Sequence, residues 1–401
     1  MIRKINLALF CATLLLLFFL AEIFMRLYGV ELRIGLSNFS RKTKISSYRK
    51  QFLNDIKNLG VTDKTFNIYF LGESTMWGVP YGPELSIPNL VEYRLGQTLG
   101  GRPVRIINLA SAAKDVAYVR YAFDLLMKEK NTFHPSLIVI YSGHNEFLKF
   151  HPSEPDYQTP IFKWLIQRSE IARELLTVIC RSKGEILEID NRDFFDRSIF
   201  PFDKNGYQKV IDQYHRHFLH MIDLSEKNKV PLVISTLVSN YSSWEPNRSI
   251  FCHSSAAEKQ KEQFEQLFRD GLAAEKQNDD QTALSAYQKA ISICDRFSEA
   301  YFREGITYKR LHDYESAWTA FQKAIDYDGM PIRGVSAQND FLLSLERFDH
   351  VYVVNSLKYL RESKEDGLLD ERLIIDGIHP NLNGYLLISE AISKEISSLF
   401  S

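Results

Sequence analysis

The sequence predicts an α/β fold: a three-layer α/β/α domain with a five-stranded parallel sheet, an all-α helical insertion and one N-terminal transmembrane helix. Three observations lead to this prediction. Short apolar runs alternate with helical patterns, a 34-residue recurrence interrupts the alternation, and the first thirty residues hold a long uncharged stretch. Alternating strands and helices are typical of a parallel sheet covered by helices on both faces.

Five short apolar runs that end in turn or polar residues are predicted as strands, at residues 67–72, 104–110, 137–141, 231–238 and 351–355. Nearly all are apolar throughout, as expected for strands that are buried on both faces of a sheet. Helical patterns cover residues 87–99, 116–128 and 161–227, and an amphipathic pattern at 385–399 closes the chain.

The N-terminus is predicted to be a membrane anchor. Arg3 and Lys4 precede seventeen uncharged residues, 5–21, and a helix of that length measures about 26 Å, close to the hydrocarbon core of a bilayer. The positive charges indicate a cytoplasmic N-terminus, with the rest of the chain outside the inner membrane if the source is bacterial. A cleaved signal peptide is the alternative, although no small-residue cleavage site follows the apolar run.

Composition excludes some functions. A hydrophobic fraction of 45%, a charged fraction of 25% and a net charge of −1 are ordinary for a globular protein. The sequence has no stripe of basic residues that would indicate nucleic-acid binding. Cys11 falls in the anchor, so Cys180, Cys252 and Cys294 allow at most one disulfide, and three unpaired thiols are the alternative.

Residues 263–328 contain only helical patterns, and they repeat with an offset of 34 residues. Small and aromatic residues recur together, as in "AYQKAI" at 286–291 and "AFQKAI" at 320–325. The matched positions are Gly271 and Gly305, Ala283 and Ala317, Tyr287 and Phe321, and Ala290 and Ala324. This segment resembles two tetratricopeptide repeats, although the proline that closes such repeats is missing. Two repeats are marginal alone, so we expect them to pack against the parent domain or against flanking helices.

Chemistry-bearing residues follow three of the predicted strands. Ser74 comes after the first strand, the small residues 110–113 after the second, and Asn145 after the third. Because the carboxyl ends of parallel strands face one crevice, we expect these groups to lie together. Near the end of the chain, Asp376 and His379 are three residues apart in a loop, a spacing that lets the carboxylate orient the imidazole.

This combination resembles the SGNH (GDSL-type) hydrolases, whose fold is flavodoxin-like. The matching segments are Gly72-Glu73-Ser74, Gly143-His144-Asn145-Glu146 and Asp376-Gly377-Ile378-His379-Pro380, with Glu at two places where the family often has Asp. The family's second segment departs, because its glycine falls on Ala113. A backbone N–H is the donor there, so alanine retains it unless the turn demands a positive φ.

The resemblance implies a serine esterase or acyltransferase that works through an acyl-serine intermediate, and the predicted N-terminal anchor would hold it at the membrane. Its catalytic residues would be Ser74, Asp376 and His379, and its oxyanion hole would comprise the N–H groups of Ser74 and Ala113 and the Asn145 amide. An acyl ester, for example acetyl on envelope carbohydrate, is the candidate substrate by analogy with the family. No cofactor or metal is expected.

The domain boundaries follow from these predictions: anchor 1–30, linker 31–64, hydrolase domain in two parts at 65–245 and 340–401, and repeat insertion at 258–330. The insertion and the stretch 147–230 leave the same sheet edge as Ser74 and are lid candidates. Glu73, His144 and Asn240 are candidate substrate contacts. His215, His217 and His220 are close enough in sequence to suggest a metal site, but only the last two share a helical face.

The alternative function is an inactive hydrolase-like adaptor whose repeats recruit a protein partner to the membrane.

Overall fold

We describe the protein from a computed structural model, which describes residues 60–149, 204–252 and 258–400. The described residues fall in one compact unit. The predicted anchor, most of the linker, Cys11, Cys180 and most of the stretch 147–230 lie outside the described residues. Among the helices that are described, none combines the length and the hydropathy that a membrane span requires.

A mixed, mostly parallel six-stranded sheet forms the centre of the α/β domain, with the order β2-β3-β1-β4-β5-β6. The strands are β1 (Phe66–Gly72), β2 (Thr98–Leu99), β3 (Arg102–Asn108), β4 (Pro135–Tyr141), β5 (Leu232–Ser235) and β6 (Val351–Val354). All five predicted strands are present and parallel, in the order second-first-third-fourth-fifth, which is flavodoxin-like. The prediction of a five-stranded, purely parallel sheet missed β2, which pairs antiparallel with β3 at the edge.

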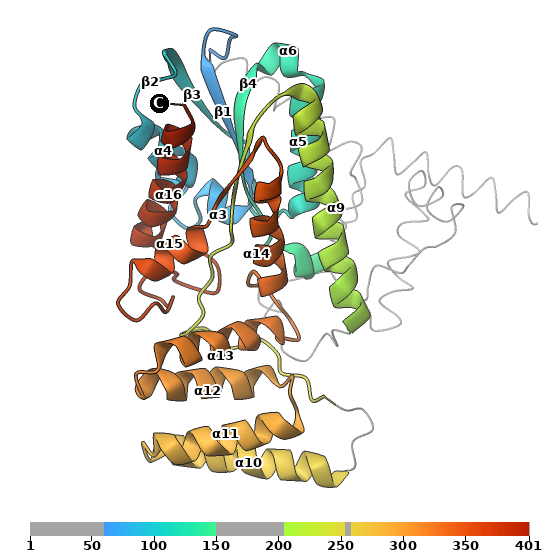
Figure 1. Cartoon of the computed structure of the whole chain (residues 1–401), viewed down its shortest axis with the longest axis vertical. Coiled ribbons are helices and arrows are strands. Elements are labelled where there is room, and N and C mark those ends of the chain that lie inside the picture. Colours follow the sequence, from blue (N-terminus) through green and yellow to red (C-terminus); the bar gives the residue numbers. More distant parts are fainter. Residues whose placement is uncertain (1–59, 150–203, 253–257, 401) are drawn as a thin grey trace, which may run out of the picture. The chain divides into compact units, whose positions relative to one another are not determined.

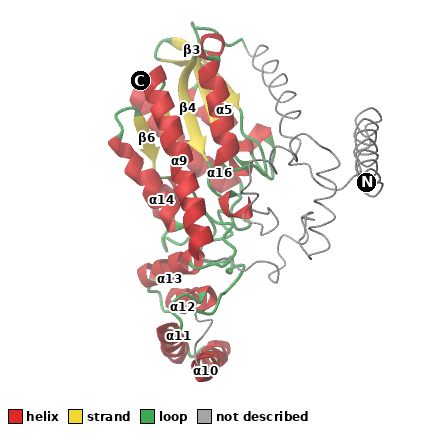
Figure 2. Ribbon diagram, turned by 90° about the vertical axis from the view of Figure 1, so that its right-hand side faces the viewer, coloured by secondary structure: helices red, strands yellow, loops and turns green. Residues whose placement is uncertain are grey.

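Helices cover both faces of the sheet (Figures 1 and 2). On one side α4 (Ile87–Leu95) packs against α16 (Leu382–Phe400), which also contacts α15 (Ser356–Glu362). On the other, α9 (Lys204–Asn228) contacts both α5 (Val116–Lys128) and α14 (Ser336–Leu343). The short helices α3 (Ser74–Trp77) and α6 (Lys130–Phe133) follow β1 and α5. Every residue of β1 is buried, as its apolar sequence requires between two helical layers.

The predicted helix at 87–99 is too long. The helix α4 ends at Leu95 because Gly96 adopts a φ of +76°, and β2 takes up Thr98 and Leu99. Glycine is the residue that most readily adopts such a conformation, so it ends the helix and turns the chain toward the sheet edge.

The insertion consists of two successive helical hairpins, α10 (Glu258–Lys276) with α11 (Asp280–Ile293) and α12 (Ser298–Arg310) with α13 (Tyr314–Asp326) (Figure 1). The 34-residue recurrence is visible in their packing. A Cβ added to Gly271 would lie 2.5 Å from the Tyr287 ring, and one added to Gly305 would lie 2.7 Å from the Phe321 ring. Glycine therefore lets the two helices of each hairpin approach closely, with an aromatic ring filling the gap. Membership of the tetratricopeptide class stays a prediction.

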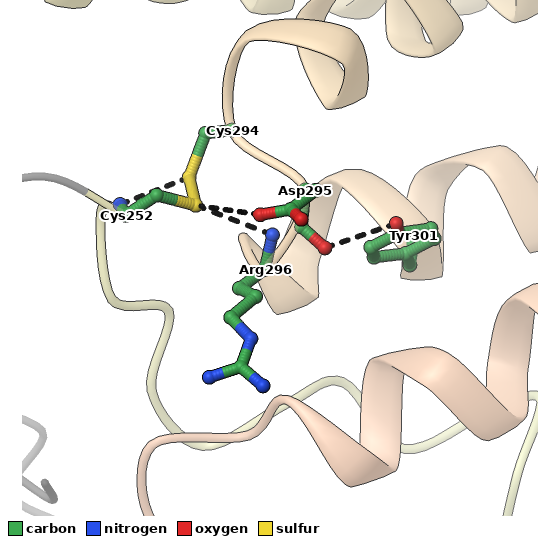
Figure 3. The surroundings of a disulfide bond; sticks show 5 residues. All are labelled: Cys252, Cys294, Asp295, Arg296 and Tyr301. Carbon is green, nitrogen blue, oxygen red and sulfur yellow. Dashed lines mark hydrogen bonds between the residues drawn. A yellow bond between two sulfur atoms is a disulfide. The ribbon is translucent and has the colours of Figure 1, made fainter. Parts of the chain in front are cut away.

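A disulfide joins Cys252 to Cys294, with an S–S distance of 2.16 Å (Figure 3). Cys252 belongs to the segment that leads out to the insertion, and Cys294 is the C-cap residue directly after α11. The Arg296 N–H donates to Cys252 Sγ at 3.3 Å, and the Tyr301 hydroxyl donates to the Asp295 carbonyl at 3.0 Å. Of the two alternatives that the cysteine count left open, one disulfide or three unpaired thiols, the structure contains the disulfide. The bond ties the end of α11 to the chain segment that leads into the insertion.

Candidate active site

Ser74 lies directly after β1, at the carboxyl end of the sheet. It is the first residue of α3 and is 8% exposed. A Cβ on Gly72 would collide with the carbonyl oxygen of Tyr141, the last residue of β4. Glycine at this position therefore lets β1 and β4 end close together, and the residues that follow the two strands come into contact.

His379 reaches Ser74 across 305 residues of sequence. Its Nε2 lies 2.8 Å from Ser74 Oγ, and its Nδ1 lies 2.8 Å from Asp376 Oδ2. The loop that carries both residues is closed on itself, because the Ile375 N–H donates to the His379 carbonyl at 2.9 Å and Ile374 bridges Pro380. The predicted spacing of Asp376 and His379 thus corresponds to a tight turn in which carboxylate and imidazole meet.

The second oxygen of Asp376 fixes the carboxylate. Asp376 Oδ1 accepts from the N–H groups of Ile378 at 2.8 Å and His379 at 2.7 Å. Burial raises the pKa of Asp376, but the hydrogen bond and charge of His379 and the two backbone bonds outweigh it, so the net pKa lies below its usual value. An ionised carboxylate only accepts, so His379 Nδ1 carries the proton and Nε2 is left to accept from the Ser74 hydroxyl.

Asn145 lies in the loop after β4, where Glu73 holds it in place. Glu73 Oε1 accepts from the Ser142 hydroxyl at 2.6 Å and from the Gly143 N–H at 2.7 Å, and Oε2 accepts from the Asn145 N–H at 3.2 Å. The Asn145 side-chain amide donates to the Lys114 carbonyl at 2.7 Å, which ties this loop to the turn after β3. The structure therefore brings the loops after β1, β3 and β4 together, as the strand order predicted.

Glu73 is a positioning group in this structure. It is 2% exposed, and both of its oxygens are occupied by the loop after β4. The net pKa of Glu73 is raised to about 7. Burial is the main cause and the charge of Asp115 adds to it, while the hydrogen bonds from Ser142, Gly143 and Asn145 act in the opposite direction. The earlier interpretation of Glu73 as a substrate contact is replaced, because a carboxylate with all its oxygens engaged internally has little to offer a ligand.

Ala113 adopts a φ of +55°, the left-handed conformation that favours glycine. The turn after β3 therefore demands a positive φ at Ala113, the condition under which alanine was expected to be unsuitable as the donor. Alanine nevertheless takes up that conformation, at a cost of about 1–2 kcal/mol. Because the side chain of Ala113 is exposed, no packing opposes the strained backbone.

The two other candidate substrate contacts differ from each other. His144 is 2% exposed and its Nε2 lies 3.2 Å from the Tyr141 hydroxyl, while its Nδ1 is a buried atom with no hydrogen-bond partner among the described residues. Burial, followed by the charge of His379, lowers the pKa of His144 to about 3, so its ring is neutral. Asn240 is 1% exposed, and its amide donates to the Ile374 carbonyl at 3.0 Å and accepts from Ser243. Asn240 therefore holds the loop of His379, and a substrate-contact role is not retained for it.

The three histidines of α9 have other contacts. His215 stacks on Phe341 with ring centroids 3.8 Å apart, His217 Nδ1 lies 3.4 Å from Arg120 Nη1, and His220 Nε2 lies 2.8 Å from Asp124. In the described part of the chain, no group of three potential ligands of the His, Cys, Asp and Glu types is arranged to hold a metal ion.

No protein-family model matches the sequence, and no curated protein is significantly similar to it. Solved structures similar to the chain include a GDSL-like lipase from Bacteroides thetaiotaomicron (11% identity, 88% of this chain and 98% of the other, TM-score 0.39). A lipase/acylhydrolase from Enterococcus faecalis shares 12% identity over 84% and 98% of the two chains, with a TM-score of 0.35. A psychrotrophic esterase from Pseudoalteromonas sp. shares 10% identity over 83% and 97%, with a TM-score of 0.34. Values this low decide neither fold nor function.

Sequence reasoning missed two features of the site. One is the set of hydrogen bonds that Glu73 accepts, for which its position next to Ser74 was the only signal in the sequence. The other is Arg333, a 1% exposed arginine that contacts the segment carrying Asn240. A single arginine between two helical patterns carries no sequence signal for such a contact.

Proposed function

We propose that this protein is a serine hydrolase of the SGNH type that cleaves or transfers an acyl group of an ester through an acyl-serine intermediate. One observation carries the proposal: Ser74 Oγ, His379 and Asp376 form a continuous hydrogen-bonded series with both links at 2.8 Å. A hydroxyl, an imidazole and an orienting carboxylate in this order are the arrangement that activates a serine nucleophile.

In the first half-reaction, Ser74 Oγ attacks the ester carbonyl carbon while His379 Nε2 accepts the hydroxyl proton. Asp376 stabilises the imidazolium that forms and keeps its ring in position. Collapse of the tetrahedral intermediate breaks the bond to the leaving alcohol, which takes the proton from His379 Nε2. The products are an acyl-Ser74 ester and the free alcohol.

The negative oxygen of the tetrahedral intermediate needs donors. The N–H groups of Ser74 and Ala113 and the second N–H of the Asn145 amide are the donors that we assign. The first N–H of that amide is already engaged by Lys114, which fixes the plane of the amide. A donor held in advance stabilises developing charge without having to reorganise.

In the second half-reaction, a water molecule or an acceptor hydroxyl gives its proton to His379 Nε2 and attacks the acyl carbon. The tetrahedral intermediate then breaks its bond to Ser74 Oγ, which takes the proton from His379 Nε2, so that both side chains are restored. Water yields a carboxylic acid, and a sugar hydroxyl yields a transferred ester. An acyl ester on envelope carbohydrate is our proposed substrate class, by analogy with the family that the sequence motifs resemble. His144, neutral and next to Asn145 in the chain, is the proposed substrate contact.

We further propose that residues 1–30 anchor the chain in the inner membrane with the hydrolase domain on the extracytoplasmic side, as the N-terminal charges indicate. Fractionation of cells that produce the full-length chain, followed by protease treatment of intact spheroplasts, tests this. Recovery in the membrane fraction with a protease-accessible domain supports the proposal, and recovery in the soluble fraction refutes the anchor.

Labelling with a fluorophosphonate probe tests the hydrolase function. The wild-type chain should react stoichiometrically, and Ser74→Ala and His379→Ala should not. Ser344→Ala is the matched control, because its exposed hydroxyl donates only to the Phe341 carbonyl. An unreactive wild-type chain would refute the hydrolase and favour the adaptor, in which the two helical hairpins recruit a protein partner.

A further inference from the structure

Two chain segments link the helical insertion to the α/β domain, and we call them together the neck: residues 239–252 leading out and residues 327–335 leading back. Asp328 joins the two segments. Its carboxylate accepts from the N–H groups of Asn247 at 2.8 Å, Arg248 at 2.9 Å and Met330 at 3.0 Å. Asp328 is 2% exposed, so the centre of the neck is a buried polar junction.

Arg333 is the cation of this junction and is 1% exposed. Its Nη1 donates to the carbonyls of Asn240 at 2.9 Å and Trp244 at 2.7 Å, and its Nη2 lies 3.7 Å from Asp328 Oδ2. A guanidinium presents several donors in a rigid plane, so one side chain fixes two carbonyls of the outgoing segment relative to the returning one.

The segment that Arg333 fixes is the one that holds the His379 loop. The Asn240 N–H donates to the Gly377 carbonyl at 3.0 Å, and its side-chain amide donates to the Ile374 carbonyl at 3.0 Å. Gly377 also packs on this region, since a Cβ added to it would lie 3.6 Å from Arg333 Cγ and 3.5 Å from Trp244 Nε1. Gly377 is the neighbour of Asp376 and lies two residues before His379.

Few other hydrogen bonds hold this loop. Apart from bonds within residues 370–381, the described chain holds residues 374–379 through the two bonds from Asn240, the contact of His379 with Ser74, and a 3.4 Å bond from the Thr75 hydroxyl to the Ile378 carbonyl. The Asn240 segment is therefore the main fixed support of the loop on the side facing the neck.

We propose that Arg333 is a positioning residue for His379, acting through Asn240, so that the seating of the helical insertion sets the geometry of the Ser74–His379 contact. The inference rests on the proposed function and gives the insertion a role in it. A buried arginine adds little net stability compared with a well-packed apolar side chain, which makes positioning the more economical explanation of its presence. Small displacements at a reacting centre are costly, and 1 Å can reduce a rate by about 10²-fold.

The test uses the full-length chain with p-nitrophenyl acetate as a chromogenic ester, after the wild type has been shown to react with the fluorophosphonate probe. Arg333→Met should lower kcat at least about tenfold with KM changed less than about twofold, because the loop supports chemistry and not ester binding. Arg333→Lys keeps the charge and can donate to one of the two carbonyls, so the kcat of this variant should lie between those of the wild type and Arg333→Met.

Arg361→Met is the matched control. Arg361 also joins the α/β domain to the insertion, lying 3.8 Å above the Trp318 ring, but its hydrogen bonds to described residues go to Gly367 and Glu315 and not to the outgoing segment of the neck, residues 239–252. Its kcat should stay at the wild-type value. Thermal unfolding of each variant separates a loss of positioning from a loss of fold.

A folded Arg333→Met chain with wild-type kcat overturns the inference. If Arg333→Met does not fold, Asn240→Asp decides, because it removes the donor to Ile374 while keeping the backbone bond to Gly377. A wild-type kcat in folded Asn240→Asp and Arg333→Lys chains also overturns the inference. An unreactive wild type refutes the proposed function itself, which distinguishes the two failures.

Discussion

Replacing Asp376 by Asn tests the proposed mechanism most directly, because the structure dictates how the new amide must lie. Asp376 Oδ1 accepts two backbone N–H bonds, from Ile378 and His379. An Asn amide keeps those bonds only if its oxygen stays there, which leaves its NH₂ group facing His379 Nδ1. The imidazole must then carry its proton on Nε2, where it can no longer accept the proton of Ser74.

The size of the effect follows from the alternative orientation. Turning the amide oxygen toward His379 leaves two N–H donors without acceptors at about 1–3 kcal/mol each, or roughly 30-fold to more than 10⁴-fold in rate. The Asp376 side chain is 38% exposed, so water relieves part of this penalty, but the charge that stabilises the imidazolium is lost as well. We expect kcat for p-nitrophenyl acetate to fall about 10³-fold.

The assay compares kcat and the rate of fluorophosphonate labelling in Asp376→Asn and in Asp366→Asn. Asp366 pairs with Arg372 in the segment before the loop and makes no contact with His379, so the same chemical change there should leave kcat unaltered. A folded Asp376→Asn chain whose kcat is within tenfold of the wild type would refute the assigned roles of Asp376 and His379.

Four further predictions follow from the site and the insertion. Asn145→Ala should lower kcat about 10²–10³-fold with a thermal midpoint near the wild-type value; turnover like the wild type would remove Asn145 from the oxyanion hole. Ala113→Gly should raise the free energy of unfolding by up to about 1 kcal/mol, because it relieves a φ of +55° at an exposed site; urea unfolding measures this, and a decrease would contradict it. Glu73 has a folded pKa of about 7 against an ordinary 4.5, so the folded state binds more protons between these values and its stability should fall as pH rises through that window. Urea unfolding at pH 5 and pH 8 should show a smaller fall for Glu73→Gln, and an equal fall would show that another group titrates. Gly305→Ala should destabilise the insertion, since its Cβ would lie 2.7 Å from the Phe321 ring, and circular dichroism should show an earlier unfolding step; an unchanged transition would mean that the helices can shift apart.

Much of the fold could be predicted because the central strands β1, β4 and β5 are largely buried on both faces. Such strands are continuous apolar runs between turn residues, and the partly exposed strands β3 and β6 are still mostly apolar in sequence. The edge strand β2 could not be found, because its two residues, Thr98 and Leu99, are too few to show an alternation of apolar and polar side chains. The 34-residue recurrence was legible because Gly271 and Gly305 each face an aromatic ring, and such a contact tolerates little substitution.

The site divides in the same way. Ser74, Asn145 and His379 follow strands or stand in short loops, and the topology of a parallel sheet is enough to bring them together. The roles of Glu73 and Asn240 could not be read, since a buried polar residue and a ligand-binding one have the same sequence appearance. Only the distances to their partners, such as 2.7 Å from Glu73 to the Gly143 N–H, tell them apart.

The clamp formed by Glu73 has a consequence for how such a centre can change. Glu73 precedes Ser74 directly in the chain, and its side chain accepts a hydrogen bond from the backbone N–H of Asn145, whose side-chain amide we assign to the oxyanion hole. Ser74 and Asn145 are thereby coupled through Glu73, so a displacement of one residue should also displace the other. Substitutions elsewhere around the site should therefore change substrate choice more readily than they change the spacing of Ser74 and Asn145.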